Sequence, residues 1–336
     1  MGYNAFLISL YDVGWLSDFG YNSQTGQMEN VTPSYSLFEK GYIDEYAFTW
    51  SGNFSNRFYL GIGINLQSMA YDMRSTYSET LSNGNSFDLK NIYTASGFGL
   101  NVSVGGLFKI SNALRVSAAI HTPTTMFLTE NYFPDINGYN PEVAGRTNYV
   151  INRPFYANLG LAYVVGKKGL ISAEYVFTNY KSTSYADEEG NKQSFAEEND
   201  GMKNMFVNGH TLKIGGEYRV NNHFSVRAGY AMQTPMVDDK KADKLMQINS
   251  LRTDAEYFVP QNINYFTLGV GYQEKGWFLD LALMHKRAAE KFIPFSPTYQ
   301  TDFDGATGIF VNIPSPQPAD INIINNNLVA TFGLRF

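Results

Sequence analysis

Apolar and polar residues alternate along most of this chain with the period of two that β-strands produce. In GFGLNVSVGG, which begins at Gly97, every second residue is bulky and apolar, and glycine, asparagine or serine stands between. The same alternation returns in LRVSAAIH, in HTLKIGGEYRV and in the last residues, LVATFGLRF. The pattern predicts strands that present one apolar face and one small or polar face.

Short polar turns and long polar connections follow one another between these strands. The short turns are SGNFSNRF, FKISNAL, VVGKKGL, RVNNHF and YQEKGW, and the long connections lie near 80–92, 133–147, 186–208, 237–256 and 296–324. Short turns at one end and long loops at the other are typical of outer-membrane barrels. We expect about eleven strands, near residues 45–53, 57–79, 93–109, 113–132, 148–165, 169–185, 209–220, 223–236, 257–273, 277–295 and 325–336.

The predicted fold is therefore all-β, a transmembrane antiparallel β-barrel of the outer membrane. A soluble β-sandwich also has alternating strands, but its strands are far shorter than 57–79 or 277–295. Composition agrees with a barrel, since aromatics make up 15% of the chain and charged residues only 17%. The sequence contains no apolar run of about 20 residues, so we expect no transmembrane helix.

Composition also limits the chemistry. The chain has no cysteine, which excludes thiol catalysis and cysteine-ligated metals. Its net charge of -6 argues against nucleic acid as a partner. The start MGYNAFLISLYDVGWLSD lacks a basic leader, so we expect no signal peptide in this chain. Because bacterial barrels have even strand counts, eleven strands predict that further strands precede residue 1 in the complete protein.

The C-terminal strand presents Phe332, Leu334 and Phe336 on one face. A final strand that ends on an aromatic residue resembles the signal by which outer-membrane barrels reach the barrel-assembly machinery. We therefore expect that machinery as a partner, together with outer-membrane lipid and lipopolysaccharide.

Several stretches taken in order resemble the FadL-type family of outer-membrane channels for long-chain fatty acids, and in particular members often labelled hemin receptor or outer membrane transport protein. They are EYAFTWSGNFSNRFYLGIGINLQSMAYDMRSTYSE, GFGLNVSVGGLFKISNALRVSAAIHTPTTMFLTENY, PFYANLGLAYVVGKKGLISAEYVFTNY, LKIGGEYRV and HFSVRAGY. The resemblance implies a fourteen-stranded barrel with an N-terminal hatch and a lateral opening in the wall. The hatch and three strands would then be missing from this chain, so the gate cannot be assigned to residues.

We divide the chain into an extracellular loop segment, 1–44, with an apolar stretch of helical spacing, and a barrel domain, 45–336. Exposed apolar patches often bind ligands, so the apolar stretch either captures a hydrophobic molecule or packs over the hatch or a neighbouring loop. His121 has lumen parity and could meet a ligand or belong to an interior hydrogen-bond network, while Phe127 belongs to an aromatic girdle or to a pocket. The candidate ligand-binding residues are Phe6, Leu7, Leu10, Trp15, His121 and Phe127.

Charged residues of both signs share the parity of the predicted lumen. They form either an interior salt-bridge lattice, which mixed signs favour, or a basic track for carboxylate ligands. They are Arg115, Glu174, Lys213, Glu217, Arg219, Arg227, Asp280 and Arg335.

No sequence pattern indicates catalysis, a metal site or a cofactor. The four histidines are scattered, and no nucleophile or metal-ligand motif accompanies them. The acidic loop 186–200 lacks the pattern of a calcium loop.

We expect a monomeric, passive channel for long-chain fatty acids or other hydrophobic small molecules. The alternatives are a general diffusion porin and a structural or adhesion barrel that acts through its extracellular loops.

Overall fold

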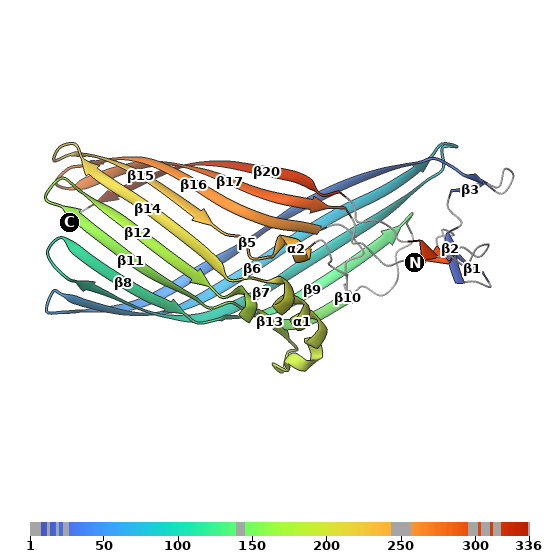
Figure 1. The fold of residues 1–336 in the computed structure, drawn as a ribbon, viewed down its shortest axis with the longest axis horizontal. Coiled ribbons are helices and arrows are strands. Elements are labelled where there is room, and N and C mark those ends of the chain that lie inside the picture. The colour runs from blue at the N-terminus through green and yellow to red at the C-terminus, as the bar shows by residue number, and fades with distance from the viewer. Residues whose placement is uncertain are drawn as a thin grey trace.

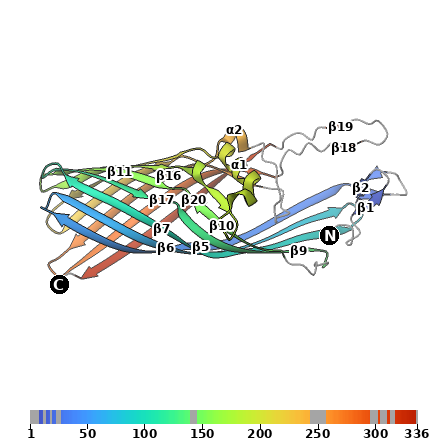
Figure 2. The ribbon, with the colours of Figure 1, turned by 90° about the horizontal axis from the view of Figure 1, so that it is seen from below.

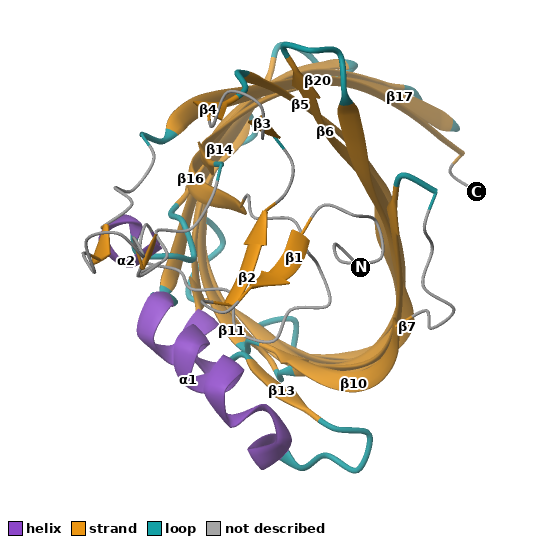
Figure 3. Ribbon diagram, turned by 90° about the vertical axis from the view of Figure 1, so that its right-hand side faces the viewer, coloured by secondary structure: helices purple, strands orange, loops and turns teal. Residues whose placement is uncertain are grey.

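The computed structural model describes residues 8–11, 14–17, 20–22, 27–138, 145–242, 257–294, 302–303, 310–311 and 317–334. Most of them form one antiparallel sheet of fourteen strands that curves around a central axis (Figures 1 and 3). The strands are β5 (Val31–Phe54), β6 (Phe58–Leu81), β7 (Ser86–Lys109), β8 (Leu114–His121), β9 (Thr124–Ile136), β10 (Gly145–Arg153), β11 (Tyr156–Val165), β12 (Gly169–Thr178), β13 (Ser184–Ala186), β14 (Gly209–Arg219), β15 (Phe224–Gln233), β16 (Tyr257–Gln273), β17 (Trp277–Ile293) and β20 (Ala319–Leu334).

Three of the fourteen strands continue the preceding strand of the chain across the sheet after a short break. They are β9, which continues β8; β11, which continues β10; and β13, which continues β12. The described sheet therefore makes eleven passes, and the predicted all-β barrel architecture is confirmed. Within the described residues β5 pairs only with β6, and β20 pairs only with β17. Four strands begin earlier than predicted. The strand β5 starts at Val31 rather than residue 45, β7 at Ser86 rather than residue 93, β10 at Gly145 rather than residue 148 and β20 at Ala319 rather than residue 325.

The three breaks lie beside one another in the wall. Pro123 follows the end of β8 and Pro154 follows the end of β10, and proline cannot donate a ladder hydrogen bond. The partners of β7 change from His121 opposite Ser103 to Thr125 opposite Leu100, so the β8–β9 strand contains one extra residue. An extra residue reverses which side chains face inward beyond it.

Register places the bulky apolar rows on one face of the sheet. Ile62, Val104 and Ile120 lie opposite one another on successive strands, and their side chains are 48%, 48% and 60% exposed. The other face is concave, because Arg153 donates to Gln67 across it although β7 and β9 separate their strands. The exposed apolar face is therefore the outer, lipid-facing one, as membrane barrels require.

Strands β5, β6, β7 and β9 project well beyond the ends of β14 and β15 at the loop end (Figures 1 and 2). On the outer face of β6 the apolar row stops at Leu66, and Asp72 and Arg74 follow. Asp72 forms ion pairs there with Lys40, at 3.8 Å, and with Arg74, at 3.3 Å. The polar outer face shows that this part of the wall stands in water rather than in lipid.

The segment expected to be helical near the N-terminus forms strands instead. Strands β1 (Ile8–Tyr11) and β2 (Gly14–Ser17) pair as an antiparallel hairpin, with Leu10 opposite Trp15. ISLY alternates with the period of a strand, and this outweighed the helical spacing of the longer segment. The prediction of an apolar helical stretch is therefore wrong for these residues.

The other elements are short. They are β3 (Tyr21–Asn22), β4 (Gln27–Met28), η1 (Tyr180–Ser182), η2 (Lys192–Phe195), α1 (Ala196–Met205), α2 (Asp239–Ala242), β18 (Asp302–Phe303) and β19 (Phe310–Val311). None of the helices in the described part of the chain has the length and apolar character of a membrane span.

Candidate functional site

The inner wall carries an apolar cluster at the loop end of the barrel. Met126 and Leu128 of β9 and Tyr149 of β10 are 2%, 5% and 7% exposed. They point inward because the extra residue between β8 and β9 places even-numbered residues of β9 on the inner face, opposite Gly97 and Gly99. We call these three residues, with the side chains that pack against them, the inner apolar cluster; the others are Met69, Ile151, Tyr185 and Phe195.

A loop that follows β12 closes over this cluster. Tyr185 of β13 and Phe195 of η2 pack on Tyr149, with ring centroids 5.5 and 6.2 Å away. Asn199 of α1 holds the loop in place, because its side chain accepts from the Tyr185 N–H at 2.7 Å and donates to the Tyr185 carbonyl at 3.0 Å. Glu130, beside the cluster, accepts hydrogen bonds from the hydroxyls of Tyr93 and Tyr149.

Below the cluster, toward the turn end, two chains of polar side chains cross the inner wall. In the first, Gln67 donates to Glu45 at 2.6 Å and accepts from Arg153 at 2.8 Å. In the second, Asn65 donates to Asn101 at 2.8 Å, and Asn101 donates to Thr124 at 3.0 Å. All three residues of the second chain are 5% exposed, and their mutual hydrogen bonds make that burial tolerable.

His121 lies at the same level, on the inner face as predicted. Its ring stacks on Tyr156 with centroids 4.1 Å apart and planes at 12°. The buried Nδ1 of His121 and Oδ1 of Asn158 have no hydrogen-bond partner among the described residues. Tyr156 and Asn158 were not predicted as site residues. Both share the inner face with His121 because the strand is interrupted at Pro154.

A hollow of about 370 Å³ extends from His121 toward the turn end. Most of its inner-facing residues are small, including Gly63 and Gly105, with the larger Tyr59 and Leu107 beside them. A Cβ at Gly63 would stand 2.5 Å from Ser103 Oγ, and one at Gly105 would stand 2.9 Å from the Ala119 Cβ. The Ala119 Cβ cannot turn away, so Gly105 cannot be replaced without displacing the backbone, whereas the Ser103 hydroxyl beside Gly63 can rotate.

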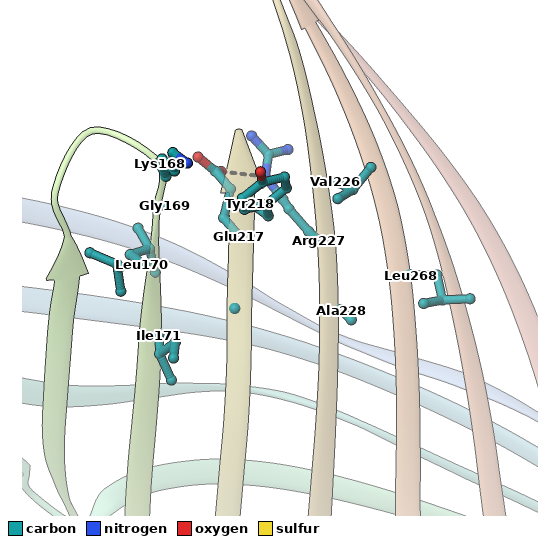
Figure 4. Close-up of a pocket in the computed structure, with 12 residues that line it drawn as sticks. Lys168, Gly169, Leu170, Ile171, Glu217, Tyr218, Val226, Arg227, Ala228 and Leu268 are labelled. Carbon is teal, nitrogen blue, oxygen red and sulfur yellow. Dashed lines mark hydrogen bonds and ion pairs between the residues drawn. The ribbon is translucent and has the colours of Figure 1, made fainter. Parts of the chain in front are cut away.

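The predicted lumen charges mostly meet in pairs. Lys213 contacts Glu174 at 3.0 Å. Arg227 lies between Glu217, at 2.7 Å, and Asp280, at 2.6 Å, and Figure 4 shows the first of these two pairs. We call Glu217, Arg227 and Asp280 the charge network.

Arg219 is a more distant partner of this network, 3.7 Å from Glu217. Arg115 is not brought to an acidic side chain among the described residues, and its buried Nε has no hydrogen-bond partner there. Arg335 lies outside the described residues. The paired charges support the salt-bridge lattice rather than a basic track.

The charge network depends on glycine in the strand between its members. Arg227 is on β15 and Asp280 on β17, so the guanidinium must reach across β16. Gly269 and Gly271 face it there, and a Cβ at Gly271 would stand 2.5 Å from Asp280 Oδ1. The missing side chain thus leaves room for the ion pair.

The remaining predicted site residues do not converge on His121. Phe127 faces outward and stacks on Phe98 with centroids 5.1 Å apart, because the extra residue before Thr124 reverses its parity. Phe332 and Leu334 are 63% and 59% exposed on the outer face of β20. The backbone of Leu10 and Trp15 is in the β1–β2 hairpin. Phe6, Leu7 and Phe336 lie outside the described residues.

No protein-family model matches the chain, and no curated protein matches it. The solved structures similar to it include that of a Pseudomonas aeruginosa FadL homologue, at 12% identity and a TM-score of 0.45, covering 85% of this chain and 75% of the other. The Pseudomonas putida toluene transporter TodX is 9% identical with a TM-score of 0.38, covering 83% and 89%. The Ralstonia pickettii toluene transporter TbuX is 12% identical with a TM-score of 0.37, covering 77% and 85%.

Proposed function

We propose that this protein is a passive channel for hydrophobic small molecules across the outer membrane. The observation that carries the proposal is the inner apolar cluster. Met126, Leu128 and Tyr149 are buried on the face that lines the lumen, where a water-filled porin presents polar residues. The loop of β13 and η2 covers this cluster, so a ligand would have to displace the loop, and an apolar surface beneath it favours a hydrophobic molecule over a hydrated solute.

The layers of the inner wall suggest a route. A ligand would pass the inner apolar cluster, then the polar level of Gln67 and His121, and then the small-residue hollow of about 370 Å³. The charges farther down are largely paired with one another, so little unpaired charge holds water in the path of an apolar molecule. Movement down a concentration gradient needs no energy source at the protein.

We propose the finer partners on separate grounds. The polar outer face of the projecting strands, with Lys40, Asp72 and Arg74, suits contact with lipopolysaccharide head groups. Phe332 and Leu334, exposed near the end of the last strand, suit recognition by the barrel-assembly machinery. We keep the monomer as a proposal of the same kind. We also propose the division into an N-terminal loop segment and a barrel, with the barrel beginning at Val31, where β5 begins, rather than at residue 45.

The test is whole-cell uptake by a strain that lacks its own outer-membrane channel for hydrophobic compounds and expresses the full-length gene. Labelled oleate and toluene are compared with a small hydrophilic sugar; toluene is included because TodX and TbuX are toluene transporters. Uptake of either hydrophobic probe without the sugar supports the proposal. Uptake of the sugar alone would make the protein a porin, and uptake of none would favour a role in the loops.

A matched pair of variants tests whether the inner apolar cluster is responsible. Met69→Gln places an amide in the cluster while preserving the length of the side chain. Met284→Gln makes the same change on the inner face of β17, outside the cluster. We expect Met69→Gln to lower hydrophobic uptake several-fold and Met284→Gln to leave it nearly unchanged. Equal uptake by the two variants would contradict the assignment.

A further inference from the structure

The outer wall contains a hollow of about 620 Å³ near the turn end of β12, β14 and β15 (Figure 4). Its floor is made of the smallest side chains on this face, those of Gly169, Gly216 and Ala228. Register places Ala228 opposite Gly216. The hollow is therefore part of the surface that meets the hydrocarbon of the membrane.

Tall apolar side chains surround this floor. Ile171, Tyr218 and Leu268 are 57%, 52% and 63% exposed, so they stand out from the wall into the surrounding lipid. A larger residue cannot take the place of Gly169 in the floor, because its Cβ would overlap the Glu217 carbonyl. The result is an apolar hollow with fixed walls, which suits a flexible hydrocarbon chain.

A cationic side chain lies at the turn end of the hollow. Lys168 lines it there, and the neighbouring Lys167 is also exposed. Neither ammonium group has an acidic partner among the described residues, and the Lys168 carbonyl accepts from the Arg219 N–H at 2.7 Å, which brings a third cationic residue to the same turn. Short turns of outer-membrane barrels lie at the periplasmic surface, where the membrane leaflet consists of phospholipid.

We propose that this hollow is a binding site for a phospholipid with an anionic head group. One acyl chain occupies the hollow over Gly216 and Ala228, and the phosphate meets Lys168. Charge complementarity selects this occupant, because a second copy of the chain or an apolar peptide would leave Lys168 without a counter-charge at the membrane surface. The apolar floor faces lipid rather than the lumen, so the proposal does not depend on the proposed transport, although Glu217 and Arg227 of the charge network also line the hollow.

Native mass spectrometry of the full-length protein in a mild detergent tests the site. The purified protein is titrated with phosphatidylglycerol and, separately, with phosphatidylcholine, and the bound lipid is counted. We expect one phosphatidylglycerol to be retained more tightly than phosphatidylcholine. Lys168→Gln should weaken phosphatidylglycerol retention about fivefold, the effect of one cation near a phosphate, and leave phosphatidylcholine unchanged. Lys181→Gln, an equal charge change in η1 at the loop end, is the control.

A second pair of variants tests the hollow itself. Ala228→Leu fills the floor with a side chain that suits a lipid-facing position, and we expect it to abolish retention of the lipid. Ala173→Leu makes the same change on the outer face of β12, beside Leu161 and Ile214 and outside the hollow. Equal retention by the two leucine variants would overturn the proposal. So would a dimer that Ala228→Leu dissociates, since the hollow would then be a contact between copies.

Discussion

Replacing Gly271 by alanine tests whether the charge network depends on the missing side chain in β16. The new Cβ would stand 2.5 Å from Asp280 Oδ1 and 2.8 Å from Ser225 Oγ. Both distances are shorter than a carbon can approach oxygen, so the Asp280 carboxylate and the Ser225 hydroxyl must shift, and we expect the carboxylate to move away from Arg227. We thus expect the added methyl group to break the Arg227–Asp280 ion pair, which reaches from β15 across β16 to β17.

The expected change in the free energy of unfolding is the sum of three contributions. The Arg227–Asp280 pair is partly exposed, with side chains 43% and 28% accessible, so its loss costs about 1 kcal/mol. Crowding against Ser225 adds about 1 kcal/mol. Alanine is favoured over glycine within a strand by about 0.5 kcal/mol, which offsets part of the loss. We therefore expect Gly271→Ala to lower the free energy of unfolding by about 1.5 kcal/mol.

The measurement is urea unfolding of the protein folded in lipid vesicles, followed by tryptophan fluorescence. Gly269→Ala is the matched control, because it lies on the same face of β16 and its Cβ would meet only Leu281 O at 3.4 Å, Arg227 Cβ at 3.6 Å and Ala282 Cβ at 3.8 Å. We expect this control to be as stable as the wild type or about 0.5 kcal/mol more stable.

A double-mutant cycle separates the ion pair from the crowding. In an Arg227→Met background the pair is already absent, so Gly271→Ala should cost only about 0.5 kcal/mol. An equal cost in both backgrounds would refute the link between the glycine and the ion pair. Equal stability of the two alanine variants would refute the steric reasoning itself.

Three further predictions concern other parts of the wall. Gly97→Ala should destabilise the protein by about 3 kcal/mol in the same urea assay, because its Cβ would overlap the Phe127 carbonyl, and normal stability would contradict the register of β7 and β9. Asn101→Leu should cost about 2 kcal/mol, since it leaves two buried hydrogen-bond partners unsatisfied, and a neutral result would mean that water replaces it. Hydrogen bonds from the Ser194 hydroxyl and the Asn191 N–H lower the pKa of Asp187. These hydrogen bonds therefore stabilise the folded loop fully above the ordinary aspartate pKa of about 3.9, and this stabilisation is lost as the pH falls through the lower pKa of the folded protein. The protection of the Asn191 amide, which is its exchange rate relative to the intrinsic rate at the same pH, should therefore fall in acid, and in Asp187→Asn it should be low at every pH.

The outer face could be predicted from the sequence because it depends on local alternation alone. Phe98, Leu100 and Val104 face lipid wherever the strand pairs, and the structure exposes all three by 45% or more. The inner charges Glu174 and Lys213 were assigned to the lumen by the same parity. Their pairing at 3.0 Å, however, depends on the register between β12 and β14, which alternation does not specify.

The candidate site was less predictable, because it lies beyond the strand breaks. The extra residue at Thr122 and Pro123 turns Phe127 outward and brings Met126 and Leu128 into the lumen, opposite to what unbroken alternation from His121 predicts. The partner of Gln67 is 86 residues away, and the link follows from the curvature of the sheet. Both signals are tertiary, although Pro123 marked where parity could fail.

The outer apolar row of β6 also determines how thick a membrane this wall can match. The row runs from Phe58 to Leu66, and the roughly eight steps between these residues span about 26 Å along the strand at a rise of about 3.3 Å per residue. A strand tilt of roughly 40° reduces the height to about 20 Å, which is below the hydrocarbon thickness of an average bilayer, about 30 Å. Hydrophobic mismatch would therefore disfavour this wall in a thick membrane and favour a thin one, so lipids with short acyl chains should give the fastest insertion and the highest stability.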